Sequence, residues 1–267
     1  MAEPILEMQN IVAGYGNTTV LHDVDIAIEN GQVACLIGPN GSGKSTLMKS
    51  IYGFADVMDG VVRFRDQEIT GRSPQDNLAD GVSYVLQDAS VFPGMSVHEN
   101  MLMGGYVFED DDRALARAEE LYDAFPILGD IRDQQAGTLS GGQRRLLELA
   151  RALMVDPEVM LLDEPSIGLE PTFIDDVFER IEQLNELGTT ILLVEQNGQK
   201  GCRSPTVALF SPAVRSNTPA PARNCSTMRR SADSTSVADL PSTPCEINKP
   251  PVRFYHYVLT PNYGKSP

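Results

Sequence analysis

The stretch GPNGSGKST, Gly38–Thr46, decides the fold of this 267-residue chain. It follows an apolar run at residues 33–37 and precedes a helical pattern that begins at Leu47, which is the strand–loop–helix setting of a phosphate-binding P-loop. Its glycines let backbone N–H groups turn toward phosphates, and the helix N-terminus adds positive potential. In this pattern Lys44 reaches the β- and γ-phosphates and Ser45 ligates magnesium. The alternative is a Gly-rich turn without a ligand.

We therefore predict that the loop binds ATP together with Mg²⁺. The residues expected around the phosphates are Gly38, Pro39, Asn40, Gly41, Ser42, Gly43, Lys44, Ser45 and Thr46.

Short apolar or alternating runs on both sides of the loop predict β-strands. These runs lie at residues 18–28, 32–37, 60–65, 82–86, 158–163 and 190–195. Helical patterns lie at residues 45–53, 142–154 and 172–187. Continuously apolar strands separated by helices indicate a mostly parallel sheet that is covered on both faces. The predicted fold is α/β, with a P-loop NTPase (RecA-like) core and an antiparallel β part near the N-terminus.

Two further segments differ from this core. From about residue 90 to residue 144 the pattern is helical, which predicts an inserted helical subdomain within a domain at residues 1–197. Residues 198–267 hold 10 of the 18 prolines and many Ser and Thr. This composition is typical of a disordered tail.

The charge distribution excludes some classes of partner. Residues 1–197 contain 12 Lys and Arg against 34 Asp and Glu, and Lys44 and Lys49 are their only lysines. A protein that binds nucleic acid needs clustered basic residues, so we expect no nucleic-acid partner. The four cysteines form no CxxC pair, which favours a reducing compartment. Because no apolar run approaches the length of a spanning helix, we expect a cytoplasmic protein whose membrane role requires partner subunits.

Two carboxylates follow the apolar run VMLLDE, Val159–Glu164. Asp163 can hold magnesium and Glu164 can polarise the attacking water as a general base. Strand alternation predicts that the two side chains point to opposite faces. A pair of acids after a strand is otherwise an ordinary solvated turn, and the P-loop earlier in the chain favours the catalytic interpretation.

The segment LSGGQ, Leu139–Gln143, lies between the P-loop and VMLLDEP. This combination resembles the ATP-binding-cassette (ABC) family of transporter ATPases. Ser140, Gly141 and Gly142 begin a helical pattern, so their N–H groups can form an anion site. The resemblance implies that this site, with Gln143, caps the γ-phosphate bound by an opposite subunit. An ordinary Ser-capped helix start is the alternative.

Three single residues gain roles only from the resemblance. Tyr15, in a GYG turn, would stack on adenine, and Gln87 would sense magnesium and the attacking water while it contacts the membrane partner. In ILLVEQN, Gln196 stands where the family usually has a histidine, and Gln cannot become a cation. The string VEQN resembles the second ATPase of branched-chain amino acid importers and the related urea importers. The alternative interpretation of Gln196 is that the chain has lost catalysis.

The resemblance ends at Asn197, which implies a cassette that is incomplete at its C-terminus. Family members continue with a strand of the form Ala-Asp-x-Gly-Phe/Tyr-Val-Leu. The codons of Pro205–Ser211, read one nucleotide earlier, permit those residues in order, so a frameshifted tail is one hypothesis. A native regulatory tail that interacts with acidic surfaces is the other.

The resemblance also implies partners. We expect a peripheral ATPase on the inner face of the cell membrane, bound to permease subunits and paired with a second ABC ATPase subunit, identical or different. A periplasmic or extracellular solute-binding protein would act indirectly. The solute itself is not encoded in this chain, since its specificity belongs to the permease. The alternatives are a soluble ABC ATPase that acts on ribosomes or DNA and an inactive truncated product.

Overall fold

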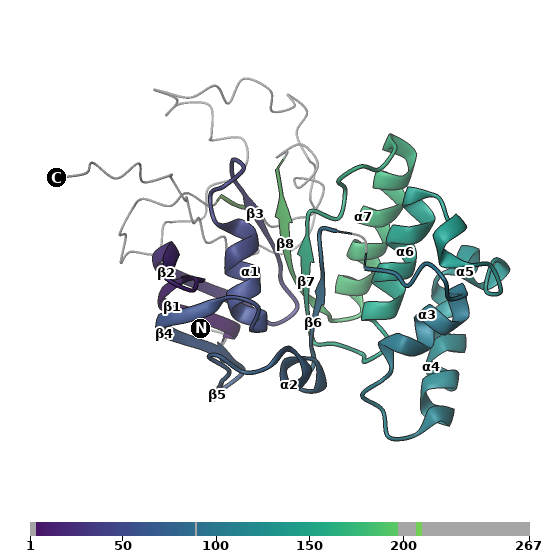
Figure 1. Cartoon of the computed structure of the whole chain (residues 1–267), viewed down its shortest axis with the longest axis horizontal. Helices are drawn as coiled ribbons and strands as arrows, with labels where there is room; N and C mark the ends of the chain where they lie inside the picture. Colours follow the sequence, from purple (N-terminus) through teal and green to yellow (C-terminus); the bar gives the residue numbers. More distant parts are fainter. Residues whose placement is uncertain (1–3, 89, 197–206, 210–267) are drawn as a thin grey trace.

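A computed structural model describes residues 4–88, 90–196 and 207–209. These residues form an antiparallel sheet, a parallel sheet and a group of helices beyond it (Figure 1). The antiparallel sheet has the strand order β2-β1-β4-β5. Its members are β1 (Pro4–Tyr15), β2 (Thr18–Glu29), β4 (Asp56–Phe64) and β5 (Gln67–Glu68). The predicted antiparallel part near the N-terminus is confirmed.

One of the two interior strands of this sheet, β1, does not follow simple alternation in the sequence. Its pairing with β2 shifts register between Met8 and Ile11, and Asn10 between them has a φ of +52°. A bulge of this kind inserts residues into one strand and interrupts its period of two. For this reason the run Pro4–Tyr15 was absent from the strands expected from alternation.

The second sheet is parallel, with the strand order β6-β7-β8-β3-β9. Its strands are β3 (Val33–Ile37), β6 (Val82–Val85), β7 (Val159–Asp163), β8 (Thr190–Glu195) and β9 (Val207–Leu209). Because all of these strands run in one direction, their carboxyl ends lie along one edge. This edge brings together loops that are far apart in the sequence.

Helices cover both faces of the parallel sheet (Figure 1). Helix α1 (Lys44–Tyr52) lies between the two sheets, and α6 (Gly141–Ala152) and α7 (Pro171–Glu186) lie on the opposite face. Successive strand residues alternate between two cores: Ala34 and Leu36 pack with α1, whereas Val33 and Cys35 pack on the side of α6 and α7. Burial on both faces explains why these strands are apolar throughout.

The stretch predicted to be helical contains several short helices. They are α3 (Val97–Gly104), α4 (Asp111–Ala124), α5 (Pro126–Asp130) and a 3₁₀ turn at Ala136–Thr138, while α2 (Pro74–Ala79) lies earlier in the chain. A capping box between Ser96 and Glu99 starts α3. A side chain on Gly104 would overlap the backbone of Arg151, so this glycine allows α3 to approach α6 closely.

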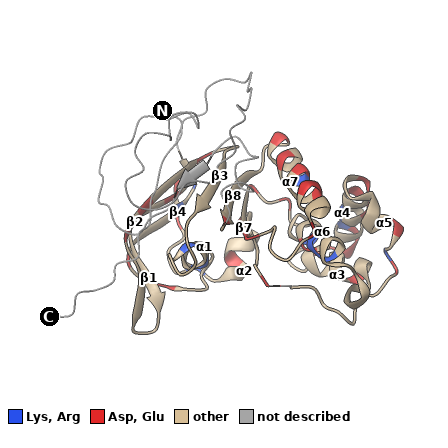
Figure 2. Cartoon of the chain, turned by 90° about the horizontal axis from the view of Figure 1, so that it is seen from above, with Lys and Arg blue, Asp and Glu red and all other residues tan. Residues whose placement is uncertain are grey.

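Acidic residues mark the outer helices, α5 and α7 among them, and Lys and Arg appear on α1, α6 and α7 (Figure 2). No helix within residues 4–88 and 90–196 is long and apolar enough to cross a membrane. Of the predicted tail at residues 198–267, the structure describes only Val207–Leu209, which form β9 beside β3. The predictions of a disordered or frameshifted tail otherwise concern residues outside the described ones.

Candidate active site

The carboxyl edge of the parallel sheet gathers most of the predicted site residues. The P-loop follows β3, Gln87 follows β6, and Asp163 ends β7. Gln196 comes directly after β8, and β8 lies between β7 and β3 in the sheet. Parallel strand order therefore places the loop, the two carboxylates and the two amides at one edge.

The P-loop turns sharply around its own lysine. Gly41 and Gly43 have φ angles of +78° and +93°, which residues with a side chain rarely adopt. A Cβ on Gly43 would lie 2.8 Å from the Leu21 side chain. Lys44 Nζ donates to the carbonyls of Gly38 (2.8 Å) and Pro39 (3.0 Å). Burial lowers the pKa of Lys44, and the nearby carboxylates of Glu164 and Asp163 oppose this effect.

One atom of the loop supports the fit of a phosphate. Ser42 is buried, and its Oγ has no hydrogen-bond partner among the residues that the structure describes. A buried hydroxyl without a partner costs about 1–3 kcal/mol. A phosphate oxygen in the loop would accept this hydrogen bond, and the exposed tip at Pro39 and Asn40 leaves the loop open to solvent.

Asp163 sits between two hydroxyl donors. Ser45 Oγ donates to its Oδ1 over 3.0 Å, and Tyr84 Oη donates to its Oδ2 over 3.0 Å. Burial raises the pKa of Asp163, and these two hydrogen bonds oppose the shift. Burial and the Asp163 charge also raise the pKa of Tyr84, which keeps its hydroxyl protonated as a donor. A hydroxyl and a carboxylate at this distance are oxygen ligands that suit Mg²⁺.

Glu164 is held by two amide groups. Gln87 Nε2 lies 3.1 Å from its Oε2, and Gln196 Nε2 lies 2.8 Å and 2.7 Å from its Oε1 and Oε2. The carboxylate is buried, with 5% of the residue exposed. The structure thus brings Glu164, Gln87 and Gln196 into contact.

The backbone at Glu164 does not continue the strand from which opposite side-chain directions were expected. Strand β7 ends at Asp163, and Glu164 has a φ of +49°, so strand alternation does not set the direction of its side chain. Its N–H donates to the Val194 carbonyl over 3.0 Å. A non-glycine residue in this region costs about 1–3 kcal/mol and is often found at functional sites. The two carboxylates have separate partners, which are hydroxyl groups at Asp163 and amide groups at Glu164.

The segment Leu139–Gln143 begins helix α6 through a capping box. Gln143 N–H donates to Ser140 Oγ over 3.2 Å, and Ser140 N–H donates to Gln143 Oε1 over 3.0 Å. A Cβ on Gly142 would overlap the Phe173 ring, whereas one on Gly141 would have room. The Ser-capped helix start weighed from the sequence is therefore present, with its N-terminal N–H groups.

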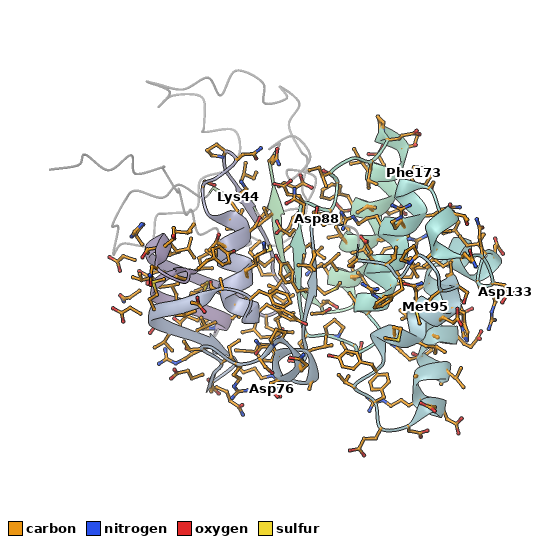
Figure 3. The ribbon with its side chains drawn as sticks, viewed as in Figure 1. Lys44, Asp76, Asp88, Met95, Asp133 and Phe173 are labelled. Carbon is orange, nitrogen blue, oxygen red and sulfur yellow. The ribbon has the colours of Figure 1, made fainter. Side chains whose placement is uncertain are left out.

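This helix start is not in contact with the P-loop of its own chain. In Figure 3, Lys44 stands at the start of α1, and Phe173, which packs on Gly142, stands near the start of α7 on the other side of the parallel sheet. Tyr15 ends β1 with 43% of its surface exposed. Its ring is thus open to stacking, while Ser140–Gln143 form a separate surface.

Sequence reasoning missed some residues at the site. Tyr84 lies within the strand predicted at residues 82–86, and no polar role was assigned to it from the sequence. Glu195 is buried, and its Oε1 accepts from Ser166 N–H over 3.2 Å. Arg145 and Glu148 form a buried ion pair on α6. A signal existed for this pair, since both charges interrupt the apolar face of a helix.

Comparison with known proteins assigns the family. The family model described as "ABC transporter" matches residues 21–167, which include the P-loop, the helix start at Ser140 and both carboxylates. The chain belongs to this family. The predicted resemblance and the ATPase activity of the family are therefore confirmed for this cassette.

Several relatives of this chain are ATP-binding proteins of named transport systems. The chain is 37% identical over 199 residues to the high-affinity branched-chain amino acid transport ATP-binding protein BraG of Pseudomonas aeruginosa, covering 74% of this chain and 85% of BraG. It is 41% identical over 197 residues to the probable branched-chain amino acid transport ATP-binding protein LivF of Archaeoglobus fulgidus, covering 73% and 83%. It is also 34% identical over 195 residues to the lipopolysaccharide export system ATP-binding protein LptB of Escherichia coli, covering 72% and 80%.

A solved structure agrees with the fold. The ADP conformation of an ATP-binding cassette of an ABC transporter superposes with a TM-score of 0.71 at 31% identity, covering 78% of this chain and 87% of that one. The α/β prediction is confirmed. The cassette is thus a nucleotide-binding ATPase subunit of a transporter. Because proteins named for branched-chain amino acid transport and for lipopolysaccharide export are both similar to it, the family does not by itself name the solute.

Proposed function

We propose that this cassette hydrolyses ATP to drive a branched-chain amino acid importer, with transport of small amides such as urea as the related possibility. The observation that supports hydrolysis is the Glu164 carboxylate, held by Gln87 and Gln196 at the sheet edge beside the P-loop. The solute class is supported by the names of BraG and LivF and by the VEQN string at the end of β8.

The side chains at the carboxyl edge of the parallel sheet have different roles in ATP hydrolysis. Lys44 places a positive charge inside the loop that would surround the phosphates. Ser45 and Asp163 would hold Mg²⁺, which neutralises phosphate charge when it is bound. Glu164 would accept a proton from the attacking water as the general base. The amides of Gln87 and Gln196 orient its carboxylate, and neither amide titrates.

We also propose that two cassettes complete each site. Lys44 and the α6 start lie on opposite sides of the parallel sheet (Figure 3), so one chain does not close Ser140, Gly141 and Gly142 over its own loop. The N–H groups of Gly141 and Gly142 at the start of α6 suit a phosphate, and a second subunit could present them. Permease subunits, an indirect solute-binding protein and a position on the inner face of the membrane complete the proposal.

The Glu164→Gln variant tests the catalytic assignment. It keeps the size of the side chain but removes the base, so we expect retained ATP binding and loss of turnover by about 100-fold or more. Glu158→Gln is the matched control, because Glu158 is exposed and pairs with Arg65 on the surface. Binding by equilibrium dialysis and phosphate release measure the two effects. Undiminished hydrolysis in Glu164→Gln would refute the assignment.

Transport itself tests the solute. Permease and solute-binding genes next to this gene would support an importer. The cassette, reconstituted with those permease subunits in proteoliposomes, should drive ATP-dependent uptake of labelled leucine. Uptake of urea alone would assign it to the related branch, and ATP-driven export with no uptake would contradict import.

A further inference from the structure

Three charged side chains lie on one face of α6, the helix that begins at Ser140. They are Arg145, Glu148 and Arg151, spaced three residues apart, so they project to the same side. Arg145 is 5% exposed and Glu148 is 3% exposed. Charged groups are rarely buried to this extent unless they are paired and hydrogen-bonded, and their partners therefore indicate what they do.

Arg145 binds the backbone of the loop that follows β6. Its Nη1 donates to the Leu86 carbonyl over 3.0 Å, and its Nη2 donates to the Gln87 carbonyl over 3.1 Å. Its Nη1 also pairs with Glu148 Oε2 at 2.8 Å. The planar guanidinium suits this geometry, because its fork of donors can contact two acceptors at once.

Glu148 and Arg151 bind the same loop three residues further on. Ser90 N–H donates to Glu148 Oε1 over 2.7 Å. Arg151 donates to the Ser90 carbonyl and to Ser90 Oγ, each over 2.7 Å. One helix face thus holds the loop at Leu86–Gln87 and again at Ser90. In Figure 3, Asp88 of this loop lies between Lys44 and Phe173. The loop therefore lies between the P-loop and the start of α7.

The same glutamine connects this contact to the catalytic carboxylate. The Gln87 carbonyl accepts from Arg145 on α6, while its side chain donates to Glu164 after β7. We propose that Arg145, supported by Glu148 and Arg151, is a positioning residue that sets Gln87 against Glu164. This inference rests on the proposed roles of Gln87 and Glu164.

Steady-state ATP hydrolysis by Arg145 variants tests the proposal. Arg145→Met should lower kcat about tenfold, which corresponds to the loss of one charge-assisted hydrogen bond, and should change KM by less than about twofold. Arg145→Lys should lose less, because an ammonium group reaches one of the two carbonyls but does not bridge both.

Arg117→Met is the matched control. Arg117 also binds a backbone carbonyl of the α6 region, Leu153 O at 3.2 Å, and it pairs with Asp156, but it does not touch the Gln87 loop. Its loss should lower the melting temperature and leave kcat within about twofold of the wild type. An equal fall of kcat in Arg117→Met would show that looser packing of α6 explains the effect and would overturn the proposal.

Two further variants separate positioning from folding. Arg145→Met alone leaves Glu148 buried without its ion-pair partner, whereas Arg145→Met with Glu148→Met removes both charges and should fold. The double variant should show the same fall in kcat. In a Gln87→Ala background, Arg145→Met should cause less than about a twofold further loss of kcat. The reason is that Arg145 acts through the contact of the Gln87 amide with Glu164, and this background lacks that amide.

The outcomes distinguish this inference from the proposed function. Wild-type kcat in Arg145→Met, or equal losses with and without Gln87, would overturn the positioning role and leave the function of Gln87 intact. Unchanged turnover in Gln87→Ala would refute the role proposed for Gln87, and the positioning role of Arg145 would fail with it.

Discussion

The P-loop and the start of α6 are both helix N-termini with glycines, yet their polar groups are in different states. At the P-loop, Ser42 Oγ is buried without a partner among the described residues, and Lys44 folds back onto the carbonyls of its own loop. At α6, Ser140 and Gln143 satisfy each other. The P-loop therefore keeps a hydroxyl group without a hydrogen-bond partner within one chain. The start of α6 offers mainly backbone N–H groups.

The difference shows how two similar sequence patterns can have different roles. A loop with an unsatisfied buried hydroxyl and a concentrated charge is ready to bind an anion. A helix start whose side chains already form a capping box is stable without a ligand. Substitutions at the P-loop should therefore weaken nucleotide binding, whereas those at α6 should affect folding or turnover.

Among the tests of this comparison, the largest expected effect is at Lys44. Lys44→Met should weaken ATP binding by about 100-fold, because charge-assisted hydrogen bonds to phosphate contribute about 3 kcal/mol. Lys49→Met is the control, since Lys49 lies in the last turn of the same helix. Isothermal titration with ATP measures both variants. Similar affinities for the two would remove the distinction between the P-loop and the rest of α1.

The next effect separates the two glycines at the start of α6. Gly142→Ala should lower the free energy of unfolding by about 1–3 kcal/mol, because its Cβ would overlap the Phe173 ring. Gly141→Ala should leave stability nearly unchanged, since its Cβ would come no closer than 3.7 Å to Leu169. Urea denaturation gives both values. Adding Phe173→Leu should restore part of the loss in Gly142→Ala, and no recovery would contradict the packing argument.

A smaller effect is expected at Gln196. Its amide makes short contacts with both oxygens of Glu164, so Gln196→Ala should lower kcat about fivefold with little change in ATP affinity. Phosphate release under ATP saturation measures it. An unchanged rate would show that this amide does nothing in turnover, and Gln87 alone would then orient the base.

The smallest effect should follow from Tyr84→Phe. This change removes one hydroxyl and its hydrogen bond to Asp163 while it keeps the aromatic contacts with Tyr52 and Phe54. Mn²⁺ binding in the presence of ATP, followed by electron paramagnetic resonance, should weaken about threefold. ATP binding without metal should stay the same. A metal affinity equal to that of the wild type would limit Tyr84 to packing.

The sequence was most informative where chemistry is local. The P-loop needs its glycines, lysine and serine in one short run, and the parallel strands need continuous apolar residues, so both follow from residue order alone. The strand β1 was missed because a bulge at Asn10 interrupts its alternation. The turn at Glu164 was also missed, because its positive φ is accompanied by a hydrogen bond to Val194 in a neighbouring strand, a contact that residue order does not reveal.

Other features depended on the tertiary structure. Gln87 and Gln196 are 109 residues apart in the chain, and they meet at Glu164 only because β6, β7 and β8 are parallel neighbours. Arg145 gains its role in the same way, from a helix packed against a distant loop. Residue order determined that this chain binds nucleotide, since each motif contains its own chemistry. Packing decided which side chains contact the Glu164 carboxylate, because those contacts join segments that the sequence keeps far apart.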